Sequence, residues 1–424
     1  MSHNAHESFR THLVKHLPAM IGLMLVMFAL EYFGLLHGYE TRALDVLFGL
    51  QGSRESQQVM IVSVGDDEYH DPELFDGTSP LRPDGLKKIL DAVAAGGPSV
   101  IAVDFDSSSE AFRNHQWPPA VWACDAEPVA DDEHGGHGSV TIHPFPALGG
   151  ELIAQPASAG VRPPRAAVVL FPRDHDGIVR RYRRVFDVVE SEGDADGAHP
   201  AQVQIDSLPW AAFKAFEATN NDRHGNNSSV APTASSAAKP LRSEDLLMNF
   251  AGDRYSFARV PARVALIGAK QSWWSERSPL KDKIVLVGGF YREARDEYIT
   301  PVGPMQGVEL LAQAIETELL GGGIRPLNTA LAMAIEFIAS VLLVYVNWRY
   351  PSPRAITLSL ICMCAAAVAG SFLAFRTLAF FFNIGAYLFG VWTHLQYDNA
   401  RDRRQLRKEV EEYRRRFGPL GAKA

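Results

Sequence analysis

The chain has 424 residues and a formal net charge of −8, with 41 lysines and arginines against 49 aspartates and glutamates. This acidic balance excludes a protein whose main partner is nucleic acid, because the phosphates repel such a surface. Of the three cysteines, only Cys124 lies outside strongly apolar sequence, which excludes a disulfide framework and a two-thiol redox site. The length leaves room for about two or three domains.

The first apolar run covers residues 17–36 and follows Arg10 and Lys15. Its length matches the roughly 20 residues that a helix needs to cross a bilayer. No small-x-small cleavage site follows it, so we predict an uncleaved transmembrane helix, with residues 1–16 in the cytoplasm, rather than a signal peptide. Glu31 lies near the outer end of this run, where its carboxylate can reach headgroup water, which favours a structural residue over a functional intramembrane carboxylate.

A strand, a helix and a second strand are predicted next. Residues 59–64 (VMIVSV) form a short apolar run of the kind that is buried on both faces of a sheet. Pro83 and Asp84 suit the start of a helix, and Gly96 ends its apolar periodicity. Residues 100–103 predict the second strand. The two strands should be parallel, so that the loops following them lie at one edge of the sheet.

Acidic residues follow both predicted strands, and ligands of open α/β sheets bind beyond the carboxyl ends of the strands. The residues that should gather there are Asp66, Asp67, Asp104 and Asp106. They predict a site for a divalent cation or a cationic ligand, or a carboxylate pair for acid/base chemistry. The alternative is structural, namely helix capping together with an ion pair to Arg82.

Two segments lack regular periodicity and predict loops, residues 112–160 and residues 219–239. The first contains His134, His137 and His143 among glycines and acidic residues. A mobile loop is favoured over a metal site here, because no predicted strand or helix fixes the positions of the three imidazoles. The second is rich in Asn, Ser and Ala and predicts an insertion.

Several shorter elements are predicted in the second half of the outer segment. Residues 166–171 and 178–189 indicate two strands of a hairpin around the turn Asp174–Gly177, since Asp-Gly is a strong turn signal. Residues 207–218 predict a helix with an aromatic core face, and residues 246–250 predict a short strand.

A buried strand is predicted at residues 283–287 (KIVLV), followed directly by Gly288 and Gly289. Such a glycine pair can admit a phosphate, but the Lys-Ser or Lys-Thr of a phosphate-binding loop is missing, which favours a structural role. Asp296 lies in the loop beyond this strand. A helix over residues 307–320 comes next and leads within a few residues into apolar sequence, so its movement should reach the bilayer.

Three further membrane spans are predicted, at residues 327–346, 355–375 and 378–395. Arg349 and Arg354 lie between the first two, and residues 401–408 are rich in arginine. By the positive-inside rule both of these regions are cytoplasmic, which places residues 37–326 in the periplasm. The expected fold class is therefore an α/β extracytoplasmic sensor domain, with a mixed, largely parallel sheet flanked by helices, plus four transmembrane helices.

The order of anchor, outer α/β domain and closing spans resembles proteins with a CHASE domain of the second type, an extracellular sensory module associated with cyclases and histidine kinases. The matching motifs are IVSVGDDE, SPLRPDGLKKIL, IAVDFD, DHDGIVRRYR and LKDKIVLVGGFYREARDEYITP, within residues 42–325. The resemblance implies a sensor. It also implies that the polar residues of these motifs bind the stimulus, namely Asp66, Asp67, Arg82, Asp104, Arg180 and Asp296, with no catalytic or metal residues and no cofactor.

The C-terminal segment, residues 396–424, is predicted to be a short basic cytoplasmic helix, too short for a cyclase, kinase or phosphatase domain. Leu406, Val410, Tyr413 and Phe417 are spaced like the apolar positions of a heptad. This spacing fits a signalling helix that forms a homodimer. A basic helix that binds anionic lipid fits the same residues equally well.

Three functions fit the sequence. We favour a multi-pass sensor of the bacterial inner membrane, with both termini cytoplasmic, that receives a small-molecule or ion stimulus and relays it to a separate cytoplasmic effector. A second reading is a membrane-anchored periplasmic hydrolase that uses Asp66 and Asp104 as a carboxylate pair. A third is a structural membrane component that carries no signal.

Overall fold

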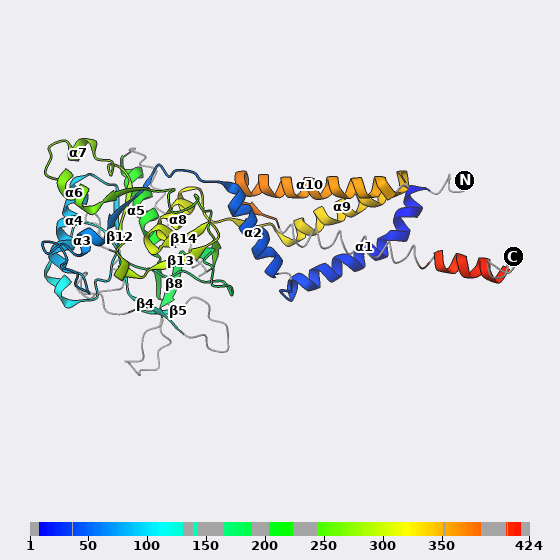
Figure 1. Ribbon diagram of the computed structural model, residues 1–424, viewed down its shortest axis with the longest axis horizontal. Coiled ribbons are helices and arrows are strands. Elements are labelled where there is room, and N and C mark those ends of the chain that lie inside the picture. Colours follow the sequence, from blue (N-terminus) through cyan, green and yellow to red (C-terminus); the bar gives the residue numbers. More distant parts are fainter. Residues whose placement is uncertain are drawn as a thin grey trace, which may run out of the picture. The chain divides into compact units, whose positions relative to one another are not determined.

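The computed structural model describes residues 8–35, 37–129, 139–142, 165–188, 203–223, 244–350, 353–382, 404 and 406–416. The chain divides into two compact units, an α/β unit over Gln51–Ile324 and a helical unit made of Met1–Leu50 and Arg325–Ala424 (Figure 1). Four groups of predictions lie outside the described residues: those on His134, His137 and His143, on most of the insertion at 219–239, on residues 383–395 of the last span, and on residues 396–403 and 417–424 of the C-terminal segment, which include Phe417.

A six-stranded sheet forms the centre of the α/β unit, and every neighbouring pair of its strands is parallel. Its strands, in spatial order, are β11 (Ala258–Pro261), β1 (Val59–Val64), β12 (Ile284–Gly289), β2 (Val100–Asp104), β3 (Val121–Cys124) and β6 (Arg165–Val168). The predicted largely parallel sheet flanked by helices is confirmed. The predicted strand, helix and strand are present as β1, α4 (Pro83–Ala95) and β2, but β12 lies between the two strands.

Helices cover both faces of this sheet (Figure 1). On one face α4 and α6 (Ala262–Gly268) share an apolar core with Met60, Val62 and Val64 of β1. On the other face, α5 (Leu208–Arg223) and α8 (Gly307–Leu319) pack around Val59 and Ile61. The continuous apolar sequence of β1 therefore serves both cores, because alternate side chains point to opposite faces.

The remaining elements of the α/β unit are short. A second, four-stranded sheet has the order β4 (Ala126–Pro128), β5 (Ser139–Ile142), β8 (Val185–Val188) and β9 (Val203–Asp206). Two antiparallel pairs join β13 (Glu297–Thr300) to β14 (Gly303–Gln306) and β7 (Arg181–Tyr182) to β10 (Leu246–Leu247). The short helices are α3 (Asp66–Tyr69) and α7 (Trp274–Arg277), with 3-10 turns at Glu110–Asn114 and Arg292–Ala294.

The hairpin predicted around the Asp174–Gly177 turn is wrong. The turn itself forms, since the Gly177 amide donates to the Asp174 carbonyl at 2.8 Å. However, β6 pairs with β3 in the parallel sheet, while β7 pairs with β10 and β8 pairs with β9. The reason is burial: Ala167 and Val168 of β6 belong to the cores on opposite faces of the large sheet, and a solvent-edged hairpin would bury only one of them.

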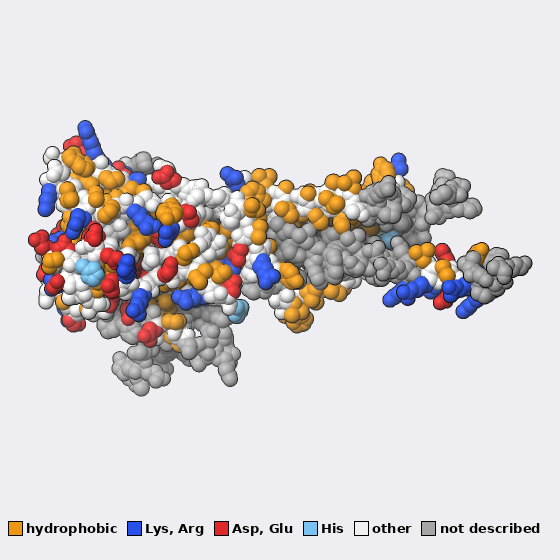
Figure 2. All heavy atoms as spheres, in the orientation of Figure 1, with side chains coloured by type: hydrophobic (Ala, Val, Ile, Leu, Met, Phe, Trp, Pro, Cys, Tyr) orange, Lys and Arg blue, Asp and Glu red, His pale blue; other side chains and the backbone are white. Residues whose placement is uncertain are grey.

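The helical unit contains α1 (Phe9–Tyr32), α2 (His37–Gln51), α9 (Thr329–Arg349) and α10 (Pro353–Leu378), and residues 406–416 are also helical. α9 packs against both α1 and α10, and the Phe9 ring lies 5.4 Å from the Tyr345 ring. Figure 2 shows mainly hydrophobic side chains along this unit, whereas acidic and basic side chains are interspersed over the α/β unit.

Two described helices are long and apolar enough to cross a membrane, Phe9–Leu30 and Thr357–Leu378, and Ala330–Val346 is a shorter apolar helix. The four predicted spans are therefore not confirmed by the part of the chain that the structure describes. The predicted break at Arg376 and Thr377 is wrong, because α10 continues through both residues to Leu378. The chain leaves the helix only at Ala379, whose φ is +52°, and β16 (Phe380–Phe381) then pairs in parallel with β15 (Arg325–Pro326).

Gly288 lets α8 approach the sheet, and this accounts for the first residue of the glycine pair. A Cβ at this position would lie 2.7 Å from Val308 Cγ2 and 2.8 Å from Val308 Cβ. We therefore expect Gly288→Ala to lower the free energy of unfolding of the α/β unit by about 2 kcal/mol, because α8 must shift from its core. Thermal unfolding of the full chain in nanodiscs measures this. Gly49→Ala, with no atom within 4 Å of the added Cβ, is the control and should not destabilise.

Candidate functional site

The carboxyl ends of three neighbouring strands meet at one edge of the large sheet. In the register of β1, β12 and β2, Ser63 lies opposite Gly288, and Gly288 lies opposite Asp104. The segments that follow these strands therefore start at the same level, and they contain most of the acidic residues that the sequence places at this edge. We call this region the sheet-edge site.

Asp104 is the last residue of β2 and is half-buried. Burial, and after it the nearby Asp296 carboxylate, raise the pKa of its carboxyl to about 7. Within the part of the chain that the structure describes, no lysine or arginine forms an ion pair with Asp104. The site thus contains a carboxyl group that can change its charge near neutral pH.

Asp296 lies where β13 meets the start of α8. Its backbone carbonyl accepts a hydrogen bond from the Gly307 amide at 2.9 Å, and a Cβ on Gly307 would overlap its carboxylate. A side chain at Gly307 would therefore displace the Asp296 carboxylate. Burial raises the pKa of Asp296, while hydrogen bonds from Tyr298 and the Gly307 amide and the charge of Arg173 oppose that rise. A change in the charge of the Asp296 carboxylate acts directly on the first turn of α8, because this carboxylate lies against Gly307.

Tyrosine side chains surround the two carboxylates. Burial raises the pKa of Tyr298 to about 12, with the Asp296 carboxylate as the next cause. The pKa of Tyr291 is also raised to about 12, by burial and then by Tyr69, whose ring stacks on it at 4.2 Å. The Arg173 guanidinium lies over the Tyr298 ring, 5.4 Å from its centroid. Both site phenols thus stay protonated at physiological pH and can donate hydrogen bonds.

Asp66 and Asp67 begin α3 directly after β1, but they differ in their contacts. Asp66 accepts a hydrogen bond from the Arg292 amide at 2.9 Å, and its carboxylate is 3.7 Å from the Arg292 guanidinium. Asp67 is exposed. The capping role belongs to the buried Glu68, which accepts from the Gly65 amide at 3.0 Å. Asp66 thus ties α3 to the segment after β12, at the border of the site.

Arg82 does not join the sheet-edge acids. It pairs with Asp76 at 2.6 Å and donates to the Pro72 carbonyl at 3.3 Å, and its side chain is 44% exposed. The alternative of an ion pair between Arg82 and the sheet-edge acids is therefore wrong. Arg82 instead closes the loop between α3 and α4.

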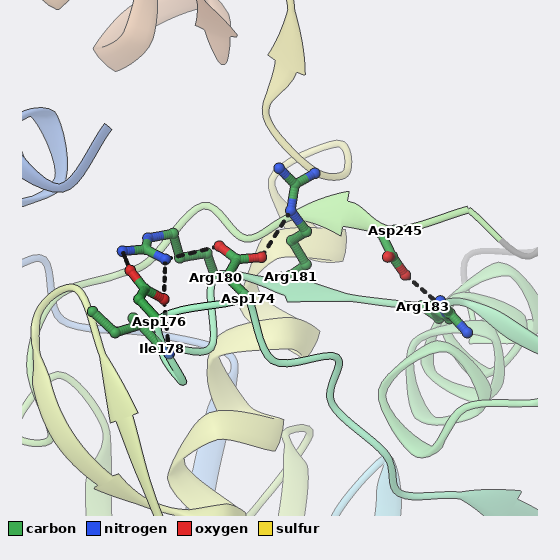
Figure 3. A network of polar contacts seen from close by, with 7 residues as sticks. All are labelled: Asp174, Asp176, Ile178, Arg180, Arg181, Arg183 and Asp245. Atoms are coloured by element: carbon green, nitrogen blue, oxygen red, sulfur yellow. Dashed lines mark hydrogen bonds and ion pairs between the residues drawn. The ribbon is translucent and has the colours of Figure 1, made fainter. Parts of the chain in front are cut away.

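Arg180 is buried, with 1% of its side chain exposed, and lies between two carboxylates (Figure 3). Its guanidinium donates to Asp174 at 2.8 Å and to Asp176 at 2.8 and 3.0 Å. It thereby fixes the turn between these aspartates. Its link to the sheet-edge site runs through the backbone, since the Val179 amide donates to the Ile299 carbonyl on β13 at 2.9 Å.

The structure therefore brings Asp104 and Asp296 together, puts Asp66 at the border, and places Arg82 and Arg180 in ion pairs of their own. Tyr291, Tyr298 and Arg173 were not predicted from the sequence as residues of this site. The two tyrosines lie in the YREARDEYITP segment around Asp296, so their position in that motif was the available signal. In the described residues no group of three or more His, Cys, Asp or Glu is arranged to hold a metal ion.

A parallel sheet covered by helices on both faces, with polar residues clustered at its carboxyl edge, defines an α/β domain, and apolar helices long enough to cross a membrane flank it in the chain. The comparison with protein families gives the particular class. The CHASE2 domain family matches residues 21–347, and the chain belongs to this family of sensory domains. The resemblance seen in the motifs is thus confirmed. Comparison with curated proteins and with solved structures gave no match.

Proposed function

We propose that the chain is a sensor of the bacterial inner membrane. Its α/β unit lies in the periplasm and binds a small molecule or an ion at the sheet-edge site. The signal passes through the apolar helices to a cytoplasmic effector. Because Asp104 and Asp296 are neighbouring carboxylates, the site favours a stimulus that carries a cationic group. The observation that carries this proposal is the contact of Asp296 with the first residue of α8.

The connection from α8 to the membrane is short. α8 ends at Leu319 and α9 begins at Thr329, so only residues 320–328 lie between the helix beside the site and the first apolar helix after it. Hydrogen bonds from the Gly322 amide to the Thr317 carbonyl at 3.0 Å and from the Ile324 amide to the Leu247 carbonyl at 2.9 Å hold this connection, so a shift of α8 is passed on to it. β15 comes just before α9, and β16 comes just after α10. Their pairing keeps the start of α9 and the end of α10 on one side, which supports the same topology.

The C-terminal helix at residues 406–416 supports a signal that leaves the protein through a helix. Leu406, Val410 and Tyr413 are 59%, 49% and 51% exposed, on a helix that is otherwise charged. Their spacing fits the seam of a two-stranded coiled coil, so we propose a homodimer that presents this helix to the effector.

Cysteine labelling in spheroplasts tests the sidedness on which the function depends. Tyr255, 73% exposed in the α/β unit, and Leu406 in the tail are each replaced by cysteine. A membrane-impermeant maleimide should label Tyr255→Cys in intact spheroplasts and Leu406→Cys only after lysis. The unsubstituted chain is the control for labelling of Cys124, Cys362 and Cys364. Labelling of Leu406→Cys but not Tyr255→Cys before lysis would invert the topology and overturn the sensor.

A further inference from the structure

Arginines of one short segment hold carboxylates from three different parts of the fold, and Figure 3 shows the contacts with two of them. As described above, Arg180 holds Asp174 and Asp176, and Arg181 is 3.4 Å from Asp174. Arg183 pairs with Asp245, the residue before β10. These contacts fix β7 and its surroundings rather than leave cations free for a ligand.

The fourth arginine holds the end of α8. Arg184 donates from Nε to Glu318 Oε1 at 2.7 Å and from Nη2 to Glu318 Oε2 at 2.8 Å. The Tyr182 hydroxyl donates to Glu318 Oε1 at 2.6 Å. Only 1% of the Glu318 side chain is exposed, so three donors from one segment neutralise a buried carboxylate in the last turns of the helix.

The same segment also holds the residues that follow α8. Arg181 of β7 pairs with Leu247 of β10. The Ile324 amide donates to the Leu247 carbonyl at 2.9 Å in an antiparallel bridge. Ile324 is the last residue of the α/β unit, and Arg325 is the first residue of the helical unit that follows it in the chain. We call residues 179–184 together with β10 the platform, and residues 320–324, through which the chain leaves the α/β unit, the exit segment. The platform thus contacts both the end of α8, at Glu318, and the exit segment, at Ile324.

The platform is connected to the sheet-edge site at its other end. Val179 donates to Ile299 of β13, three residues after Asp296, and Asp296 touches Gly307 at the start of α8. Two chains of contacts therefore connect Asp296 with the exit segment. One runs along α8 from Gly307, and the other runs along β13 to Val179 and through the platform. They converge at Glu318.

The opposite face of α8 is held by buried hydrogen bonds. Its buried side chains there are polar: Glu316 accepts from the Ser56 hydroxyl at 2.7 Å, Gln313 accepts from the Ala251 amide at 2.7 Å, and Thr317 accepts from the Asn249 amide at 3.0 Å. Buried hydrogen bonds of this kind hold that face of α8 in a defined position, so a shift of the helix must break them rather than deform them gradually.

We propose that the platform is the coupling element of the sensor: Arg184 and Tyr182 are positioning residues that, through Glu318, make the exit at residues 320–324 respond to the state of the sheet-edge site. This inference rests on the proposed function, because it supplies the route by which that site reaches the membrane helices. It requires energetic coupling between Asp296 and the exit segment that is lost when the Glu318 contacts are lost.

Hydrogen exchange of the full chain in nanodiscs, read by mass spectrometry over residues 318–324, tests the coupling. Asp296→Asn serves as the probe of the site, because it changes the charge there without a ligand. In the otherwise unchanged chain it should alter exchange of this segment by about fivefold. In an Arg184→Met background, the same substitution should leave the exchange of this segment unchanged.

Arg223→Met is the matched control, since Arg223 pairs with Asp282 away from the platform. The effect of Asp296→Asn should persist in that background. If Arg184→Met unfolds the unit, Tyr182→Phe replaces it and should reduce the effect at least in part, because it removes one donor to Glu318. An equal effect of Asp296→Asn with and without Arg184 or the Tyr182 hydroxyl, or no effect at all, overturns the proposal. Inverted topology would appear only in the labelling experiment, so the two failures are distinguishable.

Discussion

Asp104→Asn should stabilise the α/β unit at pH 8 and leave its stability nearly unchanged at pH 4. An unfolded aspartate has a pKa of about 3.9, whereas burial and Asp296 raise the pKa of Asp104 to about 7 in the folded protein. The folded state therefore binds the proton more tightly, and stability falls as the pH rises from about 4 to about 7. Asparagine does not titrate, so the variant lacks this loss.

The gap between the two pKa values corresponds to about 4 kcal/mol at most. Because Asp104 is half-buried and water reaches it, we expect about 2 kcal/mol at pH 8. Thermal unfolding of the full chain at both pH values measures the difference. Asp67→Asn, at an exposed residue of the same sheet edge, should change the stability by less than about 0.5 kcal/mol at either pH. Destabilisation of Asp104→Asn at pH 8 would show that the Asp104 carboxylate is held by a partner.

The elements that local sequence specifies were predictable. The strands β1, β2 and β12 are short apolar runs that end at glycine or aspartate, and α4 begins at the proline that its sequence indicates. In each case the cause lies within about ten residues of the element: burial on both faces selects continuous apolar sequence, and a proline suits the first turn of a helix.

Pairing between distant segments was not predictable, and the site depends on it. Asp104 and Asp296 meet because β12 inserts beside β2, an order that no local pattern contains. Arg180 has the same local appearance as Arg82, a cation beside aspartates, yet one is buried and the other is exposed. The difference arises because the segment before β7 packs against β13, a contact between residues far apart in the chain.

Arg180→Met should have the larger effect of the two arginine substitutions, lowering the free energy of unfolding by about 3 kcal/mol at pH 7. The loss of the guanidinium leaves Asp174, only 12% exposed, facing an apolar side chain, and breaking a buried ion pair by removing one partner is strongly destabilising. Arg82→Met breaks an exposed pair with Asp76 and should cost less than about 1 kcal/mol. Chemical denaturation of the full chain compares the two.

The pH dependence of the destabilisation by Arg180→Met shows whether the lost ion pairs cause it. The hydrogen bond from Arg180 is the main cause that lowers the pKa of Asp176, so the ion pair stabilises the fold above the unfolded pKa of about 4 and loses that contribution as the pH falls below it. The cost of Arg180→Met should therefore be smaller at pH 3 than at pH 7. If both arginine substitutions cost equally little, or if the cost of Arg180→Met does not change with pH, then the ion pairs of Arg180 do not stabilise the fold and the platform loses its anchor.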